Sequence, residues 1–363
     1  MIPLVHVDRQ MQSMKAEIIS CVAEIINSGQ YVLGEQGRLF EKEVCQYLNS
    51  PYTINVANGT DALVLALRSL DIGVGDEVIT TPFTFFATAE AISRVKAIPV
   101  FVDIDPVSYN MDPKLIEAKI TNRTKAIIPV HLFGKSCHME QISKIAKAHN
   151  LYVIEDACQA FGGEYNGEKL GAIGDVGCFS FFPTKNLSTF GDGGLVVTKH
   201  KKVADRIKRL RHHGSEKKYF HEEVGYNSRL DEVHAAVLRL SLQKIDQWNE
   251  TRIKKAGTYS TLADLEGYTL PQLVKGKEHV YHLYCLEHNR RDDLIQYLND
   301  QGIASGVYYP LPLHLQNVYK KLGYQHGDFP VAELKSKRLL ALPMHPFLKE
   351  EEQQYIIEQL RTF

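Results

Sequence analysis

Residues 179–194 read FSFFPTKNLSTFGDGG, and this stretch organises the chain around one lysine, Lys185. Lys185 follows the apolar run 178–182, which predicts a buried strand, and precedes the glycine-rich residues 191–194, which predict a tight turn. A lysine in a half-apolar pocket loses hydration as a cation, so its pKa falls and its neutral amine can form a Schiff base with an aldehyde. The alternative is a lysine whose stem packs on phenylalanines while its amine reaches solvent.

Short β-branched runs alternate with helical patterns over the first two thirds of the chain. The predicted strands are 52–56, 77–80, 99–103, 125–130, 151–156 and 178–182, and the predicted helices are 11–28, 36–48, 62 onward, 87–95, 204–211 and 230–254. This alternation predicts an α/β fold with a large, mostly parallel sheet covered by helices on both faces.

A second, smaller α/β domain is expected at the C-terminus. Its predicted strands are 279–285 and 303–309, and its predicted helices are 292–301, 331–339 and 349–360. We therefore expect a large domain over residues 1–245 and a small domain over residues 246–363.

Polar residues follow several of the predicted strands. Asp156, His131, Lys185 and the turn 58–61 all lie at or just after strand ends, so they can converge at one edge of the sheet. The turn 58–61 opens a helix and can present free backbone N–H groups to an anion. An ordinary capped helix start explains the same turn, and His131 is interpreted as structural.

Composition narrows the classes of function. The 42 basic and 43 acidic residues give a net charge of −1, which provides no field for nucleic acid. The six cysteines are scattered without a Cys-x-x-Cys pair, so neither a zinc site nor a disulfide framework is predicted. No signal peptide and no apolar run of membrane-spanning length is found, and we expect a cytoplasmic protein.

Asp156 and Lys185 together fit pyridoxal phosphate. An aspartate at a buried strand end needs a cationic partner, and it would keep the pyridine nitrogen protonated so that the ring acts as an electron sink. Lys185 would carry the cofactor and then move protons. An aromatic ring, Phe85, is expected over the pyridine face, although simple core packing is the alternative for it. The residues expected at the phosphate are Gly59, Thr60 and Ser180.

The chain resembles the DegT/StrS-type sugar aminotransferases of fold type I, which are built like aspartate aminotransferase. The motifs are 29–34 (GQYVLG), 58–63 (NGTDAL), 84–88 (TFFAT), 155–160 (EDACQA), 179–185 (FSFFPTK), 225–231 (GYNSRLD) and 342–346 (LPMHP). The resemblance implies that Lys185 is the Schiff-base lysine and that Asp156 pairs with the pyridinium nitrogen. It places Gln159 against the ring, although a satisfied strand-end amide is the alternative. Asn227 would complete the phosphate site of a second subunit, which implies a homodimer with shared active sites.

Four further residues are expected on the substrate side. Arg229 suits the pyrophosphate of a nucleotide sugar, because a guanidinium can bind two phosphate oxygens. The competing interpretation of Arg229 is an ion pair with Asp231 or Glu232. The other expected substrate residues are Tyr309, His314 and Tyr31.

The segment 185–194 (KNLSTFGDGG) is similar to family members that aminate carbon 3 of a nucleotide-linked keto-sugar. The family implies L-glutamate as donor and pyridoxamine phosphate as the intermediate form of the cofactor. The acceptor would be a dTDP-3-keto-6-deoxyhexose or a UDP-3-keto-N-acetyl sugar; Ser188, Thr189 and Cys158 depart from the usual pattern and leave these two open. The alternatives are a 4-keto-sugar aminotransferase and a cofactor-binding sensor or regulator. A sugar dehydratase is disfavoured because such relatives replace the lysine by histidine.

Overall fold

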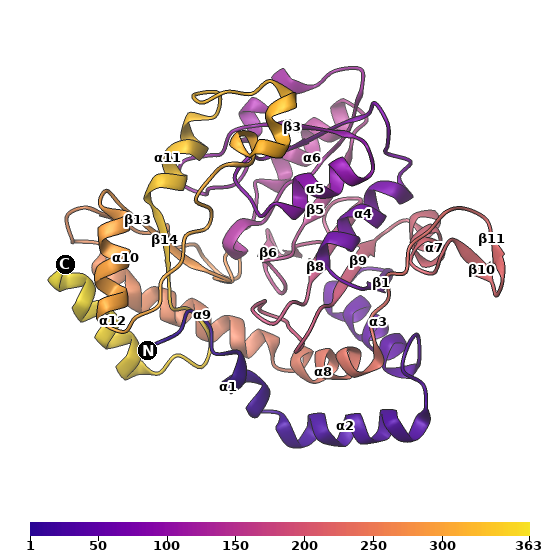
Figure 1. Cartoon of the computed structure of the whole chain (residues 1–363), viewed down its shortest axis with the longest axis horizontal. Helices are drawn as coiled ribbons and strands as arrows, with labels where there is room; N and C mark the ends of the chain where they lie inside the picture. The colour runs from indigo at the N-terminus through magenta and orange to yellow at the C-terminus, as the bar shows by residue number, and fades with distance from the viewer.

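The computed structural model describes residues Met1–Phe363, and a seven-stranded sheet forms its centre (Figure 1). The strand order is β1-β9-β8-β5-β4-β2-β3. The bounds are β1 Tyr52–Val56, β2 Glu77–Thr80, β3 Ile98–Phe101, β4 Thr124–Ile127, β5 Tyr152–Asp156, β8 Val176–Ser180 and β9 Gly194–Thr198. Only β9 runs against its two neighbours, β1 and β8, and the remaining pairs are parallel. The predicted mostly parallel sheet is confirmed, and β9 is a strand that the sequence pattern did not reveal.

Alternating strand residues face two different helix layers. On β9, Val196 packs into a core formed with α4 (Gly59–Ser69), α5 (Ala87–Arg94) and α7 (Lys201–Leu210). Its neighbours Leu195 and Val197 point the other way, into a core with α3 (Glu35–Leu48) and α8 (Glu232–Leu242). Because side chains alternate along a strand, one sheet buries apolar residues on both faces.

Two predicted helices are each divided. The pattern over 11–28 contains the end of α1 (Val7–Gln12) and then α2 (Lys15–Ser28), and the pattern over 230–254 contains α8 followed by α9 (Ile245–Tyr259). Residues 243–244 separate α8 from α9, and no glycine or proline marks this break in the sequence. The apolar periodicity of the sequence therefore continues across residues 243–244 and does not indicate the break between α8 and α9. The remaining helix between sheet strands is α6 (Met139–Ala148).

The C-terminal part is a smaller α/β layer (Figure 1). Its sheet has the order β12-β13-β14, and its elements are β12 Tyr268–Thr269, β13 Tyr284–His288, β14 Leu339–Leu342, α10 Arg291–Asp300, α11 Pro330–Arg338 and α12 Glu350–Thr362. The first residues of the chain pack here rather than on the large sheet: Ile2 pairs with Ile303, and Arg9 forms a 3.0 Å ion pair with Glu352. The boundary at residues 245/246 remains a prediction, with α9 beginning at that point.

The two strands predicted at 279–285 and 303–309 are mostly wrong. Only the last two residues of the first range belong to β13, because Tyr281 has φ +44°, a value that no strand residue adopts. In the second range only isolated bridges form, from Ile303 to Ile2 and from Gly306 to Ala341. A β-branched pattern without a continuous partner strand therefore remains a loop.

Two short hairpins complete the secondary structure. One joins β6 (Glu164–Tyr165) to β7 (Glu168–Lys169), and the other joins β10 (Ser215–Lys217) to β11 (Phe220–His221). The second hairpin projects from the body of the molecule at the right of Figure 1. None of the helices combines the length and the apolar character needed to cross a bilayer.

Candidate active site

One large cavity, of about 760 Å³, opens where the ends of the parallel strands meet the C-terminal layer. Eight residues predicted for the site line it: Gly59, Thr60, Phe85, Asp156, Gln159, Ser180, Lys185 and Tyr309. These residues come from five separate stretches of the sequence. Their position agrees with the expectation that side chains at the ends of parallel strands meet at one edge of the sheet.

Asp156 ends β5, and its carboxylate is held inside the protein. The Thr88 hydroxyl donates to Oδ2 at 2.7 Å, and the Cys158 backbone N–H lies 3.3 Å from Oδ1. The backbone of Asp156 is bonded on both sides, donating to the Pro129 carbonyl and accepting from the His131 N–H. With 6% of its surface exposed, Asp156 can still accept a hydrogen bond from a group in the cavity.

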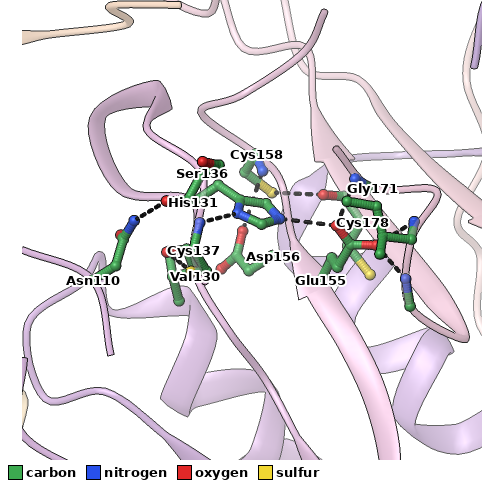
Figure 2. Close-up of polar contacts among 12 residues, drawn as sticks. Asn110, Val130, His131, Ser136, Cys137, Glu155, Asp156, Cys158, Gly171 and Cys178 are labelled. Atoms are coloured by element: carbon green, nitrogen blue, oxygen red, sulfur yellow. Dashed lines mark hydrogen bonds and ion pairs between the residues drawn. The ribbon is translucent and has the colours of Figure 1, made fainter. Parts of the chain in front are cut away.

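The preceding residue, Glu155, does not line the cavity and is fully buried in a polar cluster (Figure 2). His131 Nε2 lies 2.9 Å from its Oε2. Three backbone N–H groups also donate to this carboxylate, from Gly171 at 2.8 Å, Ile173 at 2.8 Å and Gly174 at 2.6 Å. Burial opposes ionisation, but His131 and these N–H groups outweigh it and lower the pKa of Glu155. His131 is thus structural, as expected from the sequence.

Lys185 sits in the turn after β8 with its amine enclosed. Burial lowers the pKa of Lys185 from its ordinary value, while Cys158 and Asp156 act in the opposite direction. The next residue, Asn186, anchors the turn, because its side-chain amide donates to Asn249 at 2.8 Å and to the Val280 carbonyl at 3.0 Å. An amine with a lowered pKa in a fixed turn is suited to nucleophilic and proton-transfer chemistry.

The N-terminus of α4 forms the opposite wall. Asn58 caps the helix by accepting from the Asp61 N–H at 2.8 Å, which confirms a capped helix start. The N–H groups of Gly59 and Thr60 have no partner in the chain, so they are also available to an anion in the cavity. A Cβ at Gly59 would lie 2.7 Å from Ser180 Cβ, so only glycine allows this approach to the serine.

Gln159 is fixed in one orientation. Its Oε1 accepts from the Phe133 backbone N–H at 2.6 Å, so its NH₂ group faces Tyr309, whose hydroxyl lies 3.2 Å away. Phe85 is 57% exposed and lies at the cavity, 6.2 Å from Tyr309 between ring centroids. Core packing therefore does not explain Phe85, and Gln159 is a satisfied amide that also presents a donor to the cavity.

The other four predicted residues do not line this cavity. Tyr31 and Asn227 are exposed, and Arg229 is half-buried without an ion pair to Asp231 or Glu232. Glu232 instead accepts hydrogen bonds from backbone N–H groups at the start of α3, those of Gly34, Gln36 and Gly37. The structure thus does not contain the ion pair at the start of the helix that was the competing interpretation of Arg229.

His314 is buried away from the cavity wall. Its Nε2 lies 3.0 Å from Glu333 Oε1, and its ring packs on Phe329. The Nε2 atom of His314 thus has a carboxylate partner within the chain, while its buried Nδ1 has none. The substrate contact expected for His314 remains a prediction, and His314 does not line the cavity.

Several cavity residues were not predicted. Leu4 and Val5 come from the N-terminal segment, His282 from a segment read as a strand, and Tyr308 and Asp192 from beside predicted residues. Asp192 could have been found, because it stands in the quoted motif 191–194. Burial lowers the pKa of His282 well below its usual range, and Lys185 and Arg252 add to this effect.

The residues present fit pyridoxal phosphate. Unpartnered N–H groups of α4 and the Ser180 hydroxyl suit a phosphate, and the buried Lys185 amine suits an aldehyde. Asp156 has acceptor capacity left for a protonated ring nitrogen, and Phe85 and Gln159 flank the space between. No group of three or more His, Cys, Asp or Glu side chains is arranged to hold a metal ion.

Comparison with known proteins agrees with this geometry. Residues 12–361 match the DegT/DnrJ/EryC1/StrS aminotransferase family. The chain is 47% identical to a "pleiotropic regulatory protein" of Geobacillus stearothermophilus (100% of this chain, 98% of the relative). It is 45% identical to a UDP-N-acetyl-3-dehydro-alpha-D-glucosamine 3-aminotransferase of Acidithiobacillus ferrooxidans (97% and 95%).

A solved structure also resembles this chain along its whole length. The Streptomyces venezuelae enzyme DesV, in complex with a ketimine intermediate, superposes with a TM-score of 0.97 at 40% identity, covering 99% of this chain and 98% of that one. The predicted fold and the predicted aminotransferase class are confirmed. From its cavity, its motifs and these similarities, the chain belongs to the DegT/DnrJ/EryC1/StrS aminotransferase family.

Proposed function

We propose that this aminotransferase moves an amino group from L-glutamate to carbon 3 of a nucleotide-linked keto-sugar, using pyridoxal 5′-phosphate. The observation that carries the proposal is a single cavity with Lys185 and Asp156 in its wall beside the free N–H groups of α4. Solved relatives hold the pyridoxamine form of this cofactor. Relatives named for their reaction aminate a 3-oxo position of dTDP- or UDP-linked sugars.

When bound, pyridoxal phosphate supplies an electron sink for the charge left on carbon after a proton is removed. Burial lowers the pKa of Lys185, which favours its Nζ as the base that takes the proton from the Cα of the amino donor and returns a proton in the second half of the reaction. The Asp156 carboxylate, which lines the cavity, would accept a hydrogen bond from the protonated ring nitrogen and so help to keep it protonated. Gly59, Thr60 and Ser180 would bind the phosphate, and Gln159 and Phe85 would orient the ring, since all five line the cavity.

The acceptor is a dTDP-6-deoxy-3-ketohexose or a UDP-3-keto-N-acetyl sugar. A cavity of about 760 Å³ is within the range of small-molecule sites and has room for both a cofactor and a sugar ring. Tyr309 is the substrate-side residue of this chain, since its hydroxyl lies in the cavity wall next to Gln159.

The active unit in this proposal is a homodimer. Lys185 is the one Lys or Arg side chain in the cavity wall, yet the cofactor phosphate, a sugar-linked pyrophosphate and the glutamate carboxylates are all anionic. A second copy would supply the missing donors through Asn227, Arg229 and Tyr31, which lie outside the cavity of their own chain. The projecting β10–β11 hairpin carries exposed aromatic rings that such a contact would cover, including Phe220 at 60% exposure.

A cytoplasmic location completes the proposal. All six cysteines are free thiols, three of them buried. Free thiols persist in a reducing compartment, where the nucleotide sugars and glutamate of this reaction would also meet the enzyme.

Lys185→Ala is the first test of the function. Wild-type protein loaded with pyridoxal phosphate should be yellow, should retain the cofactor covalently after borohydride reduction, and should change its spectrum on addition of L-glutamate. The variant should keep its circular dichroism and its dimer but should give no turnover, because no amine remains to hold the cofactor or move the proton. Aminosugar formation by the variant would remove Lys185 from the mechanism.

The acceptor is identified by offering a panel of dTDP- and UDP-linked 3-keto and 4-keto sugars and locating the new amine by mass spectrometry and NMR. Amination at carbon 3 supports the proposal, and amination only at carbon 4 replaces it with the 4-keto alternative. A protein that binds the cofactor but aminates no sugar would favour a sensor or regulator, in line with the name of the Geobacillus relative.

A further inference from the structure

Two threonines lie next to Asp156 and have no role in the function proposed above; Thr84 borders the cavity, and Thr88 does not. Thr84 and Thr88 flank Phe85 in the motif 84–88, at the start of α5. Both side chains are buried, with 2% and 0% of their surfaces exposed. Buried hydroxyl groups need hydrogen-bond partners, and the partners here lead to Asp156.

The direction of these hydrogen bonds is determined by chemistry. The Thr88 hydroxyl lies 2.7 Å from Asp156 Oδ2, and an ionised carboxylate can only accept, so Thr88 donates its one proton there. At the 3.1 Å contact between the two threonine hydroxyls, Thr88 must then accept and Thr84 must donate. The result is an ordered relay from Thr84 to Thr88 to Asp156.

This relay provides the hydroxyl hydrogen bond to Oδ2 of the Asp156 carboxylate. The second oxygen, Oδ1, has a single long contact of 3.3 Å to the Cys158 backbone N–H. Oδ2 is therefore occupied on the protein side, and Oδ1 keeps most of its acceptor capacity. Asp156 lies in the cavity wall, where this capacity is available to a bound group.

We propose that Thr88, ordered by Thr84, is a positioning residue that fixes the Asp156 carboxylate so that its free oxygen meets the ring nitrogen of the cofactor. The inference rests on the proposed use of Asp156 toward pyridoxal phosphate. A hydrogen bond donated to the ionised form makes a carboxylate a weaker base. The proton between the ring nitrogen and the Asp156 carboxylate would then stay on the nitrogen, which keeps the ring electron-withdrawing.

The test compares Thr88→Val, Thr88→Ser and Thr84→Val in the cofactor-loaded dimer. Valine keeps the shape of threonine without the hydroxyl, and serine keeps the hydroxyl without the methyl. Thr80→Val is the matched control, because Thr80 is equally buried but donates to the Ile128 carbonyl at 3.0 Å, away from Asp156. Two quantities besides turnover are measured: the dissociation constant for pyridoxal phosphate and the pH midpoint of the yellow absorbance.

Thr88→Val should weaken cofactor binding roughly ten- to a hundred-fold, the usual effect of losing a hydrogen bond to a charged group. It should also raise the pH midpoint of the absorbance. A ring with less positive charge makes it easier to protonate the nitrogen that joins Lys185 to the cofactor. Thr84→Val should produce the same changes at a few-fold smaller size. Thr88→Ser should stay within about two-fold of wild type, since it retains the donor.

The titratable groups around Asp156 are the same in all variants, which makes the pH midpoint comparable between them. These groups are Cys137, Cys158, Cys178, Lys185 and Tyr309. If Thr88→Val binds the cofactor like wild type with an unchanged midpoint, or if Thr88→Ser is as impaired as Thr88→Val, the inference is overturned.

Two further outcomes keep the inference and the proposed function separate. If Thr88→Val does not fold, Thr84→Val decides, because it must then show the smaller shift that the Thr80→Val control lacks. If wild-type protein itself binds no pyridoxal phosphate, the proposed function fails, and the inference fails with it. Normal wild-type binding with unaffected threonine variants would refute only the positioning role.

Discussion

Glu155 and Asp156 are neighbouring carboxylates at the end of β5, and they lie in opposite environments. Glu155 is fully buried and accepts from His131 and from three backbone N–H groups, so its two oxygens are saturated by the chain. Asp156 accepts from Thr88 and weakly from Cys158 and borders the cavity. Because side chains alternate along a strand, one position faces the protein interior and the next faces the ligand space.

The histidine beside Glu155 sharpens the contrast (Figure 2). The Cys137 backbone N–H lies 3.1 Å from His131 Nδ1, so Nδ1 accepts and carries no proton. The proton therefore resides on Nε2, which donates to Glu155. Every strong hydrogen-bonding group in this cluster is matched within the chain, and none is left for a substrate. Spare capacity next to a cavity, rather than burial alone, distinguishes the functional carboxylate.

The largest expected effect comes from Asp156→Asn. Turnover should fall by roughly 10³-fold, because an amide cannot keep the ring nitrogen protonated. The free energy of unfolding of the cofactor-free protein should change by less than about 1 kcal/mol, since the amide oxygen still accepts from Thr88. Steady-state kinetics and urea unfolding measure the two effects. A variant that keeps wild-type turnover would end the assignment of Asp156.

Glu155→Gln is the matched variant at the neighbouring position, and its pattern should be reversed. It should lower the free energy of unfolding by about 3–5 kcal/mol, because an amide nitrogen cannot accept from N–H donors that remain buried. The folded fraction should still bind pyridoxal phosphate, since Glu155 does not line the cavity. The comparison breaks down if Glu155→Gln loses cofactor binding while its stability stays at the wild-type value.

Much of this arrangement could be predicted from the sequence. The strand ends at Asp156 and at residues 178–182 were visible as apolar runs, and a parallel sheet brings such ends to one edge. The chemistry of the residues indicated Lys185 and Ser180, and the family resemblance added Gln159. The structure places all of these residues in one cavity wall.

Other features depend on contacts that no local pattern encodes. Strand β9 follows directly after the turn 191–194 and runs antiparallel to β8. Its short apolar run was not recognised as a separate strand. Leu4 and His282 reach the cavity only because the N-terminal segment and the residues around Tyr281 fold back over it. The saturation of Glu155 depends on backbone N–H groups of residues 171–174, which carry no side-chain signature.

The smallest expected effect is a difference in acid stability. Burial opposes ionisation of Glu155, but His131 and the backbone donors lower its folded-state pKa below the unfolded value of about 4.3. This group therefore contributes stability that is fully present above about pH 4.3 and is lost as the pH falls through the folded-state pKa. Unfolding of wild-type protein, followed by urea titration from pH 6 downward, should show this loss.

In Glu155→Gln the same acid-dependent loss should be smaller, because the titrating group is gone. Glu352→Gln is the control: its carboxylate has a pKa lowered to about 2, chiefly by Arg9, and it lies outside the β5 cluster. That variant should lose a separate part of the acid dependence and keep the contribution of Glu155. If Glu155→Gln and wild type lose stability in parallel below pH 4.3, Glu155 is not ionised in the folded protein, and the contrast between the two carboxylates must rest on hydrogen bonding alone.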